Sequence, residues 1–160
     1  MPNYLPVVIA NEFLKRHSGT SIPAQMQLQK LVYIAHGWNL AINAQPLVSE
    51  SPEAWDNGPV FRSLWDHIRD WGFGAKTKLL EEPFDGKVAS ASLSKDEMDV
   101  IDHVWKKYGQ YNGLQLSRMT HEPNTPWTAT YFARGRNQSI PNDETKKHYI
   151  QLAMAGRDRA

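Results

Sequence analysis

The fold is decided by the stretch QLQKLVYIAHGWNLAIN, which occupies residues 27–43. Its apolar side chains recur about every three or four residues, the spacing of one face of an α-helix. These side chains are Leu28, Leu31, Val32, Ala35, Trp38 and Ile42. Because proline is tolerated in the first turn of a helix, the pattern predicts a long, core-forming helix from Pro23 to about Asn43.

The same helix carries a second stripe of side chains, about 130° around its axis from the apolar one. The stripe consists of Gln29, Tyr33, His36 and Leu40. Polar and aromatic groups in one row suit a contact surface that also makes hydrogen bonds. They equally suit a helix face packed under a neighbouring loop, and the sequence leaves both interpretations open.

Further helices are predicted on either side of this one. They cover residues 5–17, 60–71, 94–109 and 112–120, with two more beginning near Thr125 and Asn142. Ser94 and Glu97 form a capping-box pattern, in which each side chain can satisfy a free backbone N–H of the other residue. Residues 46–59 and 84–92 have little helical character and can hold one or two short strands.

A length of 160 residues suits one domain. We expect a mainly α fold, a compact single-domain helical bundle with a minor β or irregular insertion. The domain is expected to span residues 1–160, with its core at about residues 5–155. In the final helix, Tyr149, Leu152 and Ala153 are expected to be buried.

The composition excludes several classes of site. The chain has no cysteine, so disulfides, thiolate catalysis and cysteine-ligated metal centres are ruled out. With 18 basic and 17 acidic side chains the net charge is +1, so no global field selects nucleic acid or a membrane surface. No apolar run approaches the roughly 18 residues of a membrane-spanning helix. We expect no targeting segment, and a cytoplasmic location.

The C-terminal end is more basic than the rest of the chain. Residues 134–160 carry 6 basic and 3 acidic side chains. This excess fits a solvated helix face, and it also fits a docking surface for an acidic partner or for nucleic acid. In a nucleic-acid-binding regulator, the helix at 112–120 would present Gln115 and Arg118. Two side chains give little support for sequence-specific recognition of DNA, so nucleic acid is not the partner we expect.

Catalytic motifs are missing. The six histidines include no H-E-x-x-H zinc helix, and the chain has no G-x-S-x-G elbow, phosphate loop or dinucleotide fingerprint. We therefore expect a protein that is not an enzyme and that uses no cofactor and no metal. The alternative is a hydrolase, which requires convergence in one cleft of His36, His121, Glu122 and Asp56.

Two proline-bounded turns hold tryptophans in constrained positions. In EAWDNGPV at residues 53–60, Asn57-Gly58 favours a positive φ and Pro59 keeps Gly58 out of a helix. The turn either serves only to connect two elements of the fold or presents Trp55 to a partner. The stretch THEPNTPW at residues 120–127 repeats this arrangement with Trp127.

The six tryptophans divide by their sequence context. Those on apolar helix stripes are expected in the core, namely Trp38, Trp65, Trp71 and Trp105. The other two, Trp55 and Trp127, are the pair expected at a partner interface, where aromatic anchors commonly dominate the binding energy.

A series of short motifs follows one family's order along the chain. The motifs are ANEFL at 10–14, MQLQKLVYIAHGW at 26–38, PL at 46–47, EAWDNGPV at 53–60, VW and YG within 104–109, LS and TH within 116–121, PW at 126–127 and IP at 140–141. With them, the chain resembles the Panacea domain family of SocA-like antitoxins and phage-associated GepA-like proteins over residues 8–150. The resemblance implies a mainly helical antitoxin of a bacterial or phage toxin–antitoxin system, which neutralises a cognate toxin protein by direct contact.

The resemblance also implies which residues belong at the partner interface. The positions that match the family pattern are Gln29, Lys30, Tyr33, His36, Trp55, Gly58, Pro59, His121, Pro126 and Trp127. Antitoxins of this family often carry variable extensions, of which this chain has almost none. Specificity for one toxin is therefore expected on the domain surface, at residues 73–92 and 134–160. The identity of the toxin, the route of neutralisation and the oligomeric state are not predicted.

Overall fold

The computed structural model describes residues 3–16, 25–69, 79–82 and 86–155. In chain order its elements are α1 (Pro6–Arg16), α2 (Gln25–Asn43), β1 (Glu53–Trp55), β2 (Gly58–Val60), α3 (Arg62–Ile68), α4 (Lys95–Tyr108), α5 (Gly113–Thr120), α6 (Pro126–Arg134), β3 (Gln138–Ser139) and α7 (Asn142–Ala155). The described part of the chain is mostly helical and has a small three-stranded antiparallel sheet, which confirms the predicted mainly α fold class.

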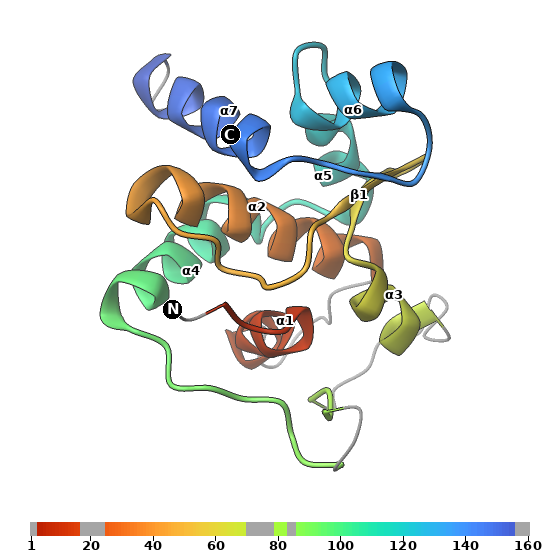
Figure 1. Cartoon of the computed structure of the whole chain (residues 1–160). Coiled ribbons are helices and arrows are strands. Elements are labelled where there is room, and N and C mark those ends of the chain that lie inside the picture. The colour runs from red at the N-terminus through yellow and green to blue at the C-terminus, as the bar shows by residue number, and fades with distance from the viewer. Residues whose placement is uncertain (1–2, 17–24, 70–78, 83–85, 156–160) are drawn as a thin grey trace.

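Helix α2 lies at the centre of the molecule. It contacts α1, α4, α5 and α7, and Figure 1 shows it between α1 on one side and α7 on the other. Every residue from Gln27 to Leu40 is buried. Both stripes of this helix therefore face protein rather than solvent, as in a helix that is covered all round.

Close approach of α7 to α2 depends on Gly37. A Cβ atom at this position would collide with the ring of Tyr149. Tyr149 is buried, and its ring meets those of Tyr33 and Trp38 edge-on at centroid distances of 6.4 and 5.2 Å. The glycine thus provides the space in which an aromatic cluster joins α2 to α7.

One buried side chain holds the described part of the connection between α3 and α4. Asn11 on α1 donates from Nδ2 to the carbonyl oxygens of Leu80 and Ala89, at 2.9 and 2.8 Å, and its Oδ1 accepts from Leu80 N–H at 2.7 Å. These bonds satisfy backbone groups that would otherwise be buried without partners. Within the described residues, the predicted strand region 84–92 contributes an isolated bridge between Glu81 and Val88 and no strand of its own.

Capping residues begin three of the helices where the sequence predicts them. Ser94 and Glu97 form the predicted capping box at α4. Asn112 forms another at α5 together with Gln115, and Thr125 caps α6. These side chains satisfy backbone donors that a helix N-terminus otherwise leaves free.

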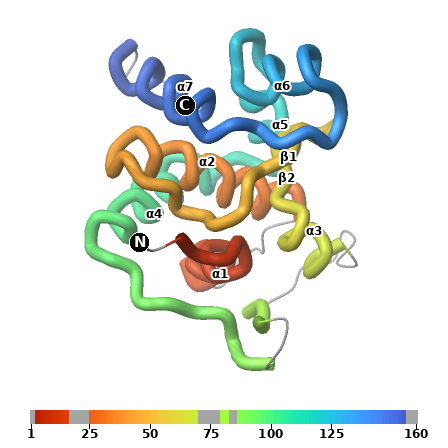
Figure 2. Tube along the Cα trace, in the orientation of Figure 1, coloured from red at the N-terminus to blue at the C-terminus, as the bar shows by residue number. Residues whose placement is uncertain are grey.

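The sheet has β1 at its centre, with β2 and β3 antiparallel on either side. Strands β1 and β2 form a hairpin in which Glu53 pairs with Val60 and Trp55 with Gly58, and β3 brings Ser139 opposite Glu53. Figure 2 shows the hairpin between α3 and α6. The hairpin overlaps the region predicted to hold strands, whereas β3 is not predicted, because two exposed polar residues show no strand periodicity.

Several details differ from the predictions. Helix α3 begins at Arg62 rather than at residue 60, because Val60 pairs with Glu53 of β1 and Phe61 is the extended N-cap residue. Ile42 is 57% exposed and Ala153 is exposed, so their expected places in the core were wrong. Each lies in the last turns of its helix, beyond the buried stretch. Trp65, predicted in the core, is only half-buried, and Trp71 lies outside the described residues.

Candidate functional site

The candidate site is built beside the β1–β2 turn, where Trp55 and Trp65 are both half-buried. Their rings meet edge to face at 5.3 Å, and Trp55 Nε1 donates to Glu53 Oε1 at 2.8 Å. Arg62 lies 5.8 Å from the Trp55 ring and Arg69 lies 5.5 Å from the Trp65 ring, both in cation–π range. We call the surface formed by these two tryptophans and two arginines the Trp–Arg face.

The turn beside this face is fixed by Asp56. Its carboxylate accepts from Arg136 at 2.9 and 2.6 Å, and from the Tyr131 hydroxyl at 2.7 Å. These hydrogen bonds lower the pKa of Asp56, with Arg136 contributing most and Tyr131 next. The bidentate pair joins the β1–β2 turn to the loop between α6 and β3.

Two aromatic residues support the hairpin from the inside. Trp127 is 5% exposed, and its Nε1 donates to the carbonyl oxygen of Trp55 at 2.6 Å. The His121 ring lies 3.9 Å from that of Trp127, with Nε2 2.9 Å from the Asp56 carbonyl oxygen and Nδ1 2.6 Å from that of Ser117. Of the pair predicted at a partner interface, Trp55 therefore reaches the surface and Trp127 lies behind it.

Gly58 allows the hairpin to approach α2 and α5. Its φ is +118°, which agrees with the positive φ predicted for this turn. A Cβ atom there would lie 2.6 Å from Cε of Lys30 and 3.0 Å from Oγ1 of Thr120. Such a contact requires the neighbouring atoms to move, so glycine is needed for both its conformation and its size. Pro59 follows in β2, buried opposite Ala54.

A cavity of ≈ 410 Å³ opens next to the Trp–Arg face. It is lined by residues of α2, the hairpin, α3 and the loop before β3. Trp55, Trp65 and Val60 contribute apolar surface, and Lys30 also lines it. Lys30 is 1% exposed, and burial lowers the pKa of its amine to about 7. We call this space the Lys30 cavity.

Two other predicted residues of α2 make hydrogen bonds inside the fold. Gln29 Oε1 accepts from Phe61 N–H at 3.0 Å, and Gln29 Nε2 donates to the Phe61 carbonyl oxygen at 3.1 Å. The two bonds fix the chain between β2 and α3. His36 is fully buried, and its Nδ1 accepts from Val48 N–H at 3.2 Å. Because a backbone N–H can only donate, the proton sits on Nε2, which donates to Asn142 Oδ1 at 2.9 Å. Burial lowers the pKa of His36 and favours this neutral form.

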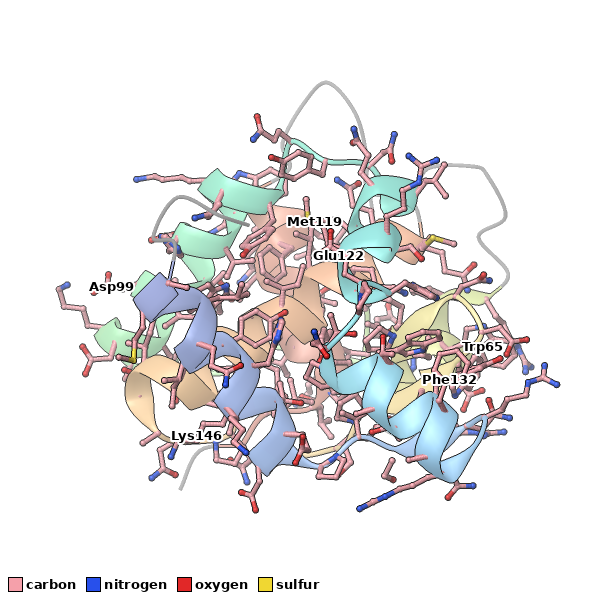
Figure 3. The ribbon with its side chains drawn as sticks, turned by 90° about the horizontal axis from the view of Figure 1, so that it is seen from above. Trp65, Asp99, Met119, Glu122, Phe132 and Lys146 are labelled. Carbon is pink, nitrogen blue, oxygen red and sulfur yellow. The ribbon has the colours of Figure 1, made fainter. Side chains whose placement is uncertain are left out.

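Tyr33 and Pro126 line a second cavity of ≈ 420 Å³, formed by α2, α4, α5, α6 and α7. Tyr33 is 2% exposed, and burial raises its pKa. His148 lies on the α7 side, and burial lowers its pKa. Figure 3 shows two further lining residues, Met119 and Glu122, at the C-terminal end of α5.

The four residues required for a hydrolase are not gathered around one reacting centre. The Asp56 carboxylate is bound by Arg136, His121 faces backbone oxygens, and His36 is sealed in the core. Glu122 lines the second cavity instead. In the described part of the chain, no group of three or more histidine and acidic side chains is arranged to hold a metal ion.

The helix predicted as a reader of nucleic acid is α5. Gln115 closes its capping box by accepting from Asn112 N–H at 2.8 Å, while Arg118 is exposed. One exposed arginine does not make a recognition helix. Among the described helices, none is long and apolar enough to cross a lipid bilayer.

Sequence reasoning does not identify Arg62, Arg69 and Arg136 as site residues, and it assigns Trp65 to the core. A local signal exists for Trp65 and Arg69, because residues one helical turn apart meet on the helix surface. Arg136 lies within the basic segment 134–160 expected to carry specificity, but no local signal points to its partner. Its partner Asp56 lies 80 positions away, so the pair is visible only in the folded chain.

Comparison with known proteins identifies the family of this chain. The family model for the antitoxin SocA-like Panacea domain matches residues 28–128, and the chain belongs to this family. The matched range contains all ten positions predicted at the partner interface. The chain is also similar to antitoxin SocA of Caulobacter vibrioides (strain NA1000 / CB15N), with 28% identity over 137 residues, 82% of this chain and 73% of that protein. No solved structure matches the chain.

Proposed function

We propose that this chain is an antitoxin that neutralises a cognate toxin by binding it directly. The observation that carries the proposal is membership of the SocA-like antitoxin family, matched across residues 28–128. The similar Caulobacter protein is itself named an antitoxin. In this proposal residues 1–160 act as one domain, the toxin is a protein partner, and the complex forms in the cytoplasm.

The Trp–Arg face supports a role in protein binding. Tryptophan and arginine are among the side chains that most often dominate the energy of protein–protein interfaces. Phe132 extends the aromatic surface, since it is 75% exposed and its ring lies 5.3 Å from that of Tyr131 and 6.2 Å from that of Trp127. Figure 3 shows Phe132 and Trp65 on the same side of the molecule. A toxin that covers this side would bury both aromatic groups.

The proposed binding surface is held in place by its supporting contacts. Trp127 and Arg136 bond to the hairpin turn, and Gln29 bonds to the chain that leaves β2. Anchors that are already ordered lose less conformational entropy on binding. The ten predicted interface positions then divide into Trp55, which contacts the toxin, Lys30, which lines the neighbouring cavity, and buried or half-buried residues that support them.

The proposal assigns no catalytic step to the chain. Both ring nitrogens of His36 and of His121 are within hydrogen-bond distance of groups inside the fold, which supports this assignment. Neutralisation by binding requires one antitoxin site for each toxin molecule that is inhibited. An enzyme would instead inactivate many toxin molecules in turn, so the stoichiometry separates the two mechanisms.

The test is co-expression of this chain with the protein encoded by the neighbouring gene. We expect that protein to arrest growth when expressed alone, and the arrest to be relieved by this chain. The purified proteins should elute together in gel filtration, and toxin activity should fall to its minimum near molar equivalence. A neighbour that is harmless alone, or whose toxicity is unchanged by this chain, overturns the proposal. Full neutralisation far below molar equivalence overturns the binding mechanism in favour of an enzyme.

A further inference from the structure

Lys30 differs from other polar side chains buried in α2. Gln27 and Asn39 each donate to a backbone carbonyl oxygen at 2.8 Å, and Gln29 and His36 make the hydrogen bonds described above. No hydrogen bond or ion pair joins Lys30 Nζ to any residue that the structure describes, and burial alone accounts for its lowered pKa. The fold therefore makes no internal use of this amine.

An amine without a partner is costly to bury, because it loses its hydration and gains nothing in return. A methionine of similar length would fill the same space with no polar group. We therefore expect Lys30 to lower the stability of the free protein, a pattern typical of functional sites. Lys30 lines the Lys30 cavity, although only 1% of the residue is exposed.

The charge around this cavity is unbalanced. Its charged lining residues within the described chain are Asp56, Arg62, Arg136 and Lys30 itself. Asp56 is already engaged by Arg136 and by the hydroxyl of Tyr131. The cavity therefore offers cationic groups, apolar walls and no acidic lining group that remains without a partner.

We propose that the Lys30 cavity receives an acidic side chain of the toxin, whose carboxylate pairs with the amine of Lys30. The inference rests on the proposed function, because it takes the toxin as the occupant. Charge complementarity selects a carboxylate over an amine. Once a toxin segment covers the cavity, the apolar walls of Trp55, Trp65 and Val60 lower the local dielectric, which strengthens an ion pair formed between them. The aspartate or glutamate would sit at the tip of a toxin segment that also covers the Trp–Arg face.

The pairing predicts that binding takes up a proton. With a pKa of about 7, Lys30 is largely neutral above neutral pH in the free protein. An incoming carboxylate favours the ammonium form, so the complex holds a proton that the free protein lacks. The other charged groups that line the cavity are Asp56, whose pKa is lowered, Arg136, whose pKa is raised, and Arg62, which lies 3.8 Å from the Glu53 carboxylate. Affinity for the toxin should therefore decrease as the pH rises above about 7.

The experiment compares wild type, Lys30→Met and a matched control, Lys95→Met, which removes a lysine from the surface of α4. Binding to the purified protein of the neighbouring gene is measured by calorimetry in buffers of different ionisation enthalpy, at several pH values. We expect wild type to take up a proton, Lys30→Met to bind about tenfold or more weakly without uptake, and Lys95→Met to behave as wild type. Thermal unfolding should show Lys30→Met at least as stable as wild type.

Each outcome decides between the two proposals. If wild type neither binds nor neutralises the neighbouring protein, the proposed function fails. If wild type neutralises it and Lys30→Met binds equally well, only the inference about the Lys30 cavity is overturned. If Lys30→Met fails to fold, the measurements on wild type decide whether the inference holds. Wild-type binding without proton uptake overturns it, and so does an affinity for the toxin that does not fall above pH 7.

Discussion

The indole N–H of Trp127 lies 2.6 Å from the carbonyl oxygen of Trp55, although the two residues are 72 positions apart in sequence. The bond links the start of α6 to the end of β1. One tryptophan thereby fixes the backbone from which the other projects at the surface. Of the two tryptophans predicted at a partner interface, Trp55 is half-buried at the surface and Trp127 is buried in a supporting position.

Replacing Trp127 by phenylalanine tests this support. The variant keeps an aromatic ring and leaves the Trp55 carbonyl without its donor, which should cost about 1–2 kcal/mol in the free energy of urea unfolding. Trp55→Phe is the matched control, because it loses a half-exposed bond to Glu53 and should cost about 0.5 kcal/mol. If the two variants are equally stable, the bond from Trp127 does not hold the hairpin.

Phe132 tests the extent of the binding surface. Because the side chain is 75% exposed, Phe132→Ala should change stability by less than about 0.5 kcal/mol while weakening toxin binding about fivefold or more. Leu114→Ala removes another exposed apolar side chain, 58% exposed on α5, and should leave binding unchanged. Calorimetry on both variants checks the prediction. Equal affinities of Phe132→Ala and wild type would remove α6 from the interface.

Gly58 is expected to tolerate no side chain. Gly58→Ala combines a strained φ of +118° with a Cβ atom 2.6 Å from Lys30, and should lower stability by about 3 kcal/mol or more. Gly135→Ala is a matched control, because its φ is +106° and no atom lies within 4 Å of the added Cβ. It should cost about 1 kcal/mol. Similar losses in the two variants would show that only the backbone conformation matters.

Acidification should destabilise the protein through His36. An imidazolium cannot accept the bond from Val48 N–H, and the folded-state pKa lies below the unfolded value of 6.5. The stability that His36 provides is therefore complete above pH 6.5 and is lost as the pH falls through the folded-state pKa. Burial also lowers the pKa of His103 and His148, which add to the slope in the same direction.

The measurement for His36 compares slopes. Urea unfolding of wild type and His36→Gln is followed at several pH values on both sides of 6.5. We expect the variant to be less stable above that pH but to decline less steeply below it. Parallel slopes would mean that His36 does not contribute to acid sensitivity.

Lys30 should also make stability rise with pH, but over the neutral to alkaline range. Its pKa is about 7 in the folded chain and 10.5 in the unfolded chain, so between these values only the unfolded state holds the proton. Wild-type stability should therefore rise with pH over this range relative to Lys30→Met, by up to about 4–5 kcal/mol. Tyrosines titrate in both proteins, so the difference in unfolding free energy between wild type and Lys30→Met reports on Lys30 alone. A variant less stable than wild type at pH 7 would contradict the cost assigned to this amine.

The sequence predicts those features of the fold that depend on local chemistry. Ser94 with Glu97 begins α4 as predicted, and the turn before Pro59 contains a glycine with positive φ. Such signals act over a few residues and hold in most folds. The motif series identifies the family in the same way, because it lies along the chain in order.

Features that depend on long-range contact are not predicted. Strand β3 exists because β1 pairs with it, and the bond between Arg136 and Asp56 joins segments 80 positions apart. Lysine is normally exposed, so nothing in the sequence places Lys30 in the core. Trp127 is buried and Trp65 is only half-buried. This difference depends on how α6 and α3 pack against the hairpin, which is also a long-range contact.

The pairing of β3 with β1 has a consequence for the evolution of this protein. The family match ends at residue 128, whereas β3 and the Arg136 wall of the Lys30 cavity follow it. Substitutions at residues 135–139, between α6 and the family motif at 140–141, can reshape the wall of the cavity while the helices stay unchanged. Under the proposed function, a change in this short border segment would alter the surface that meets the toxin without any change in the core.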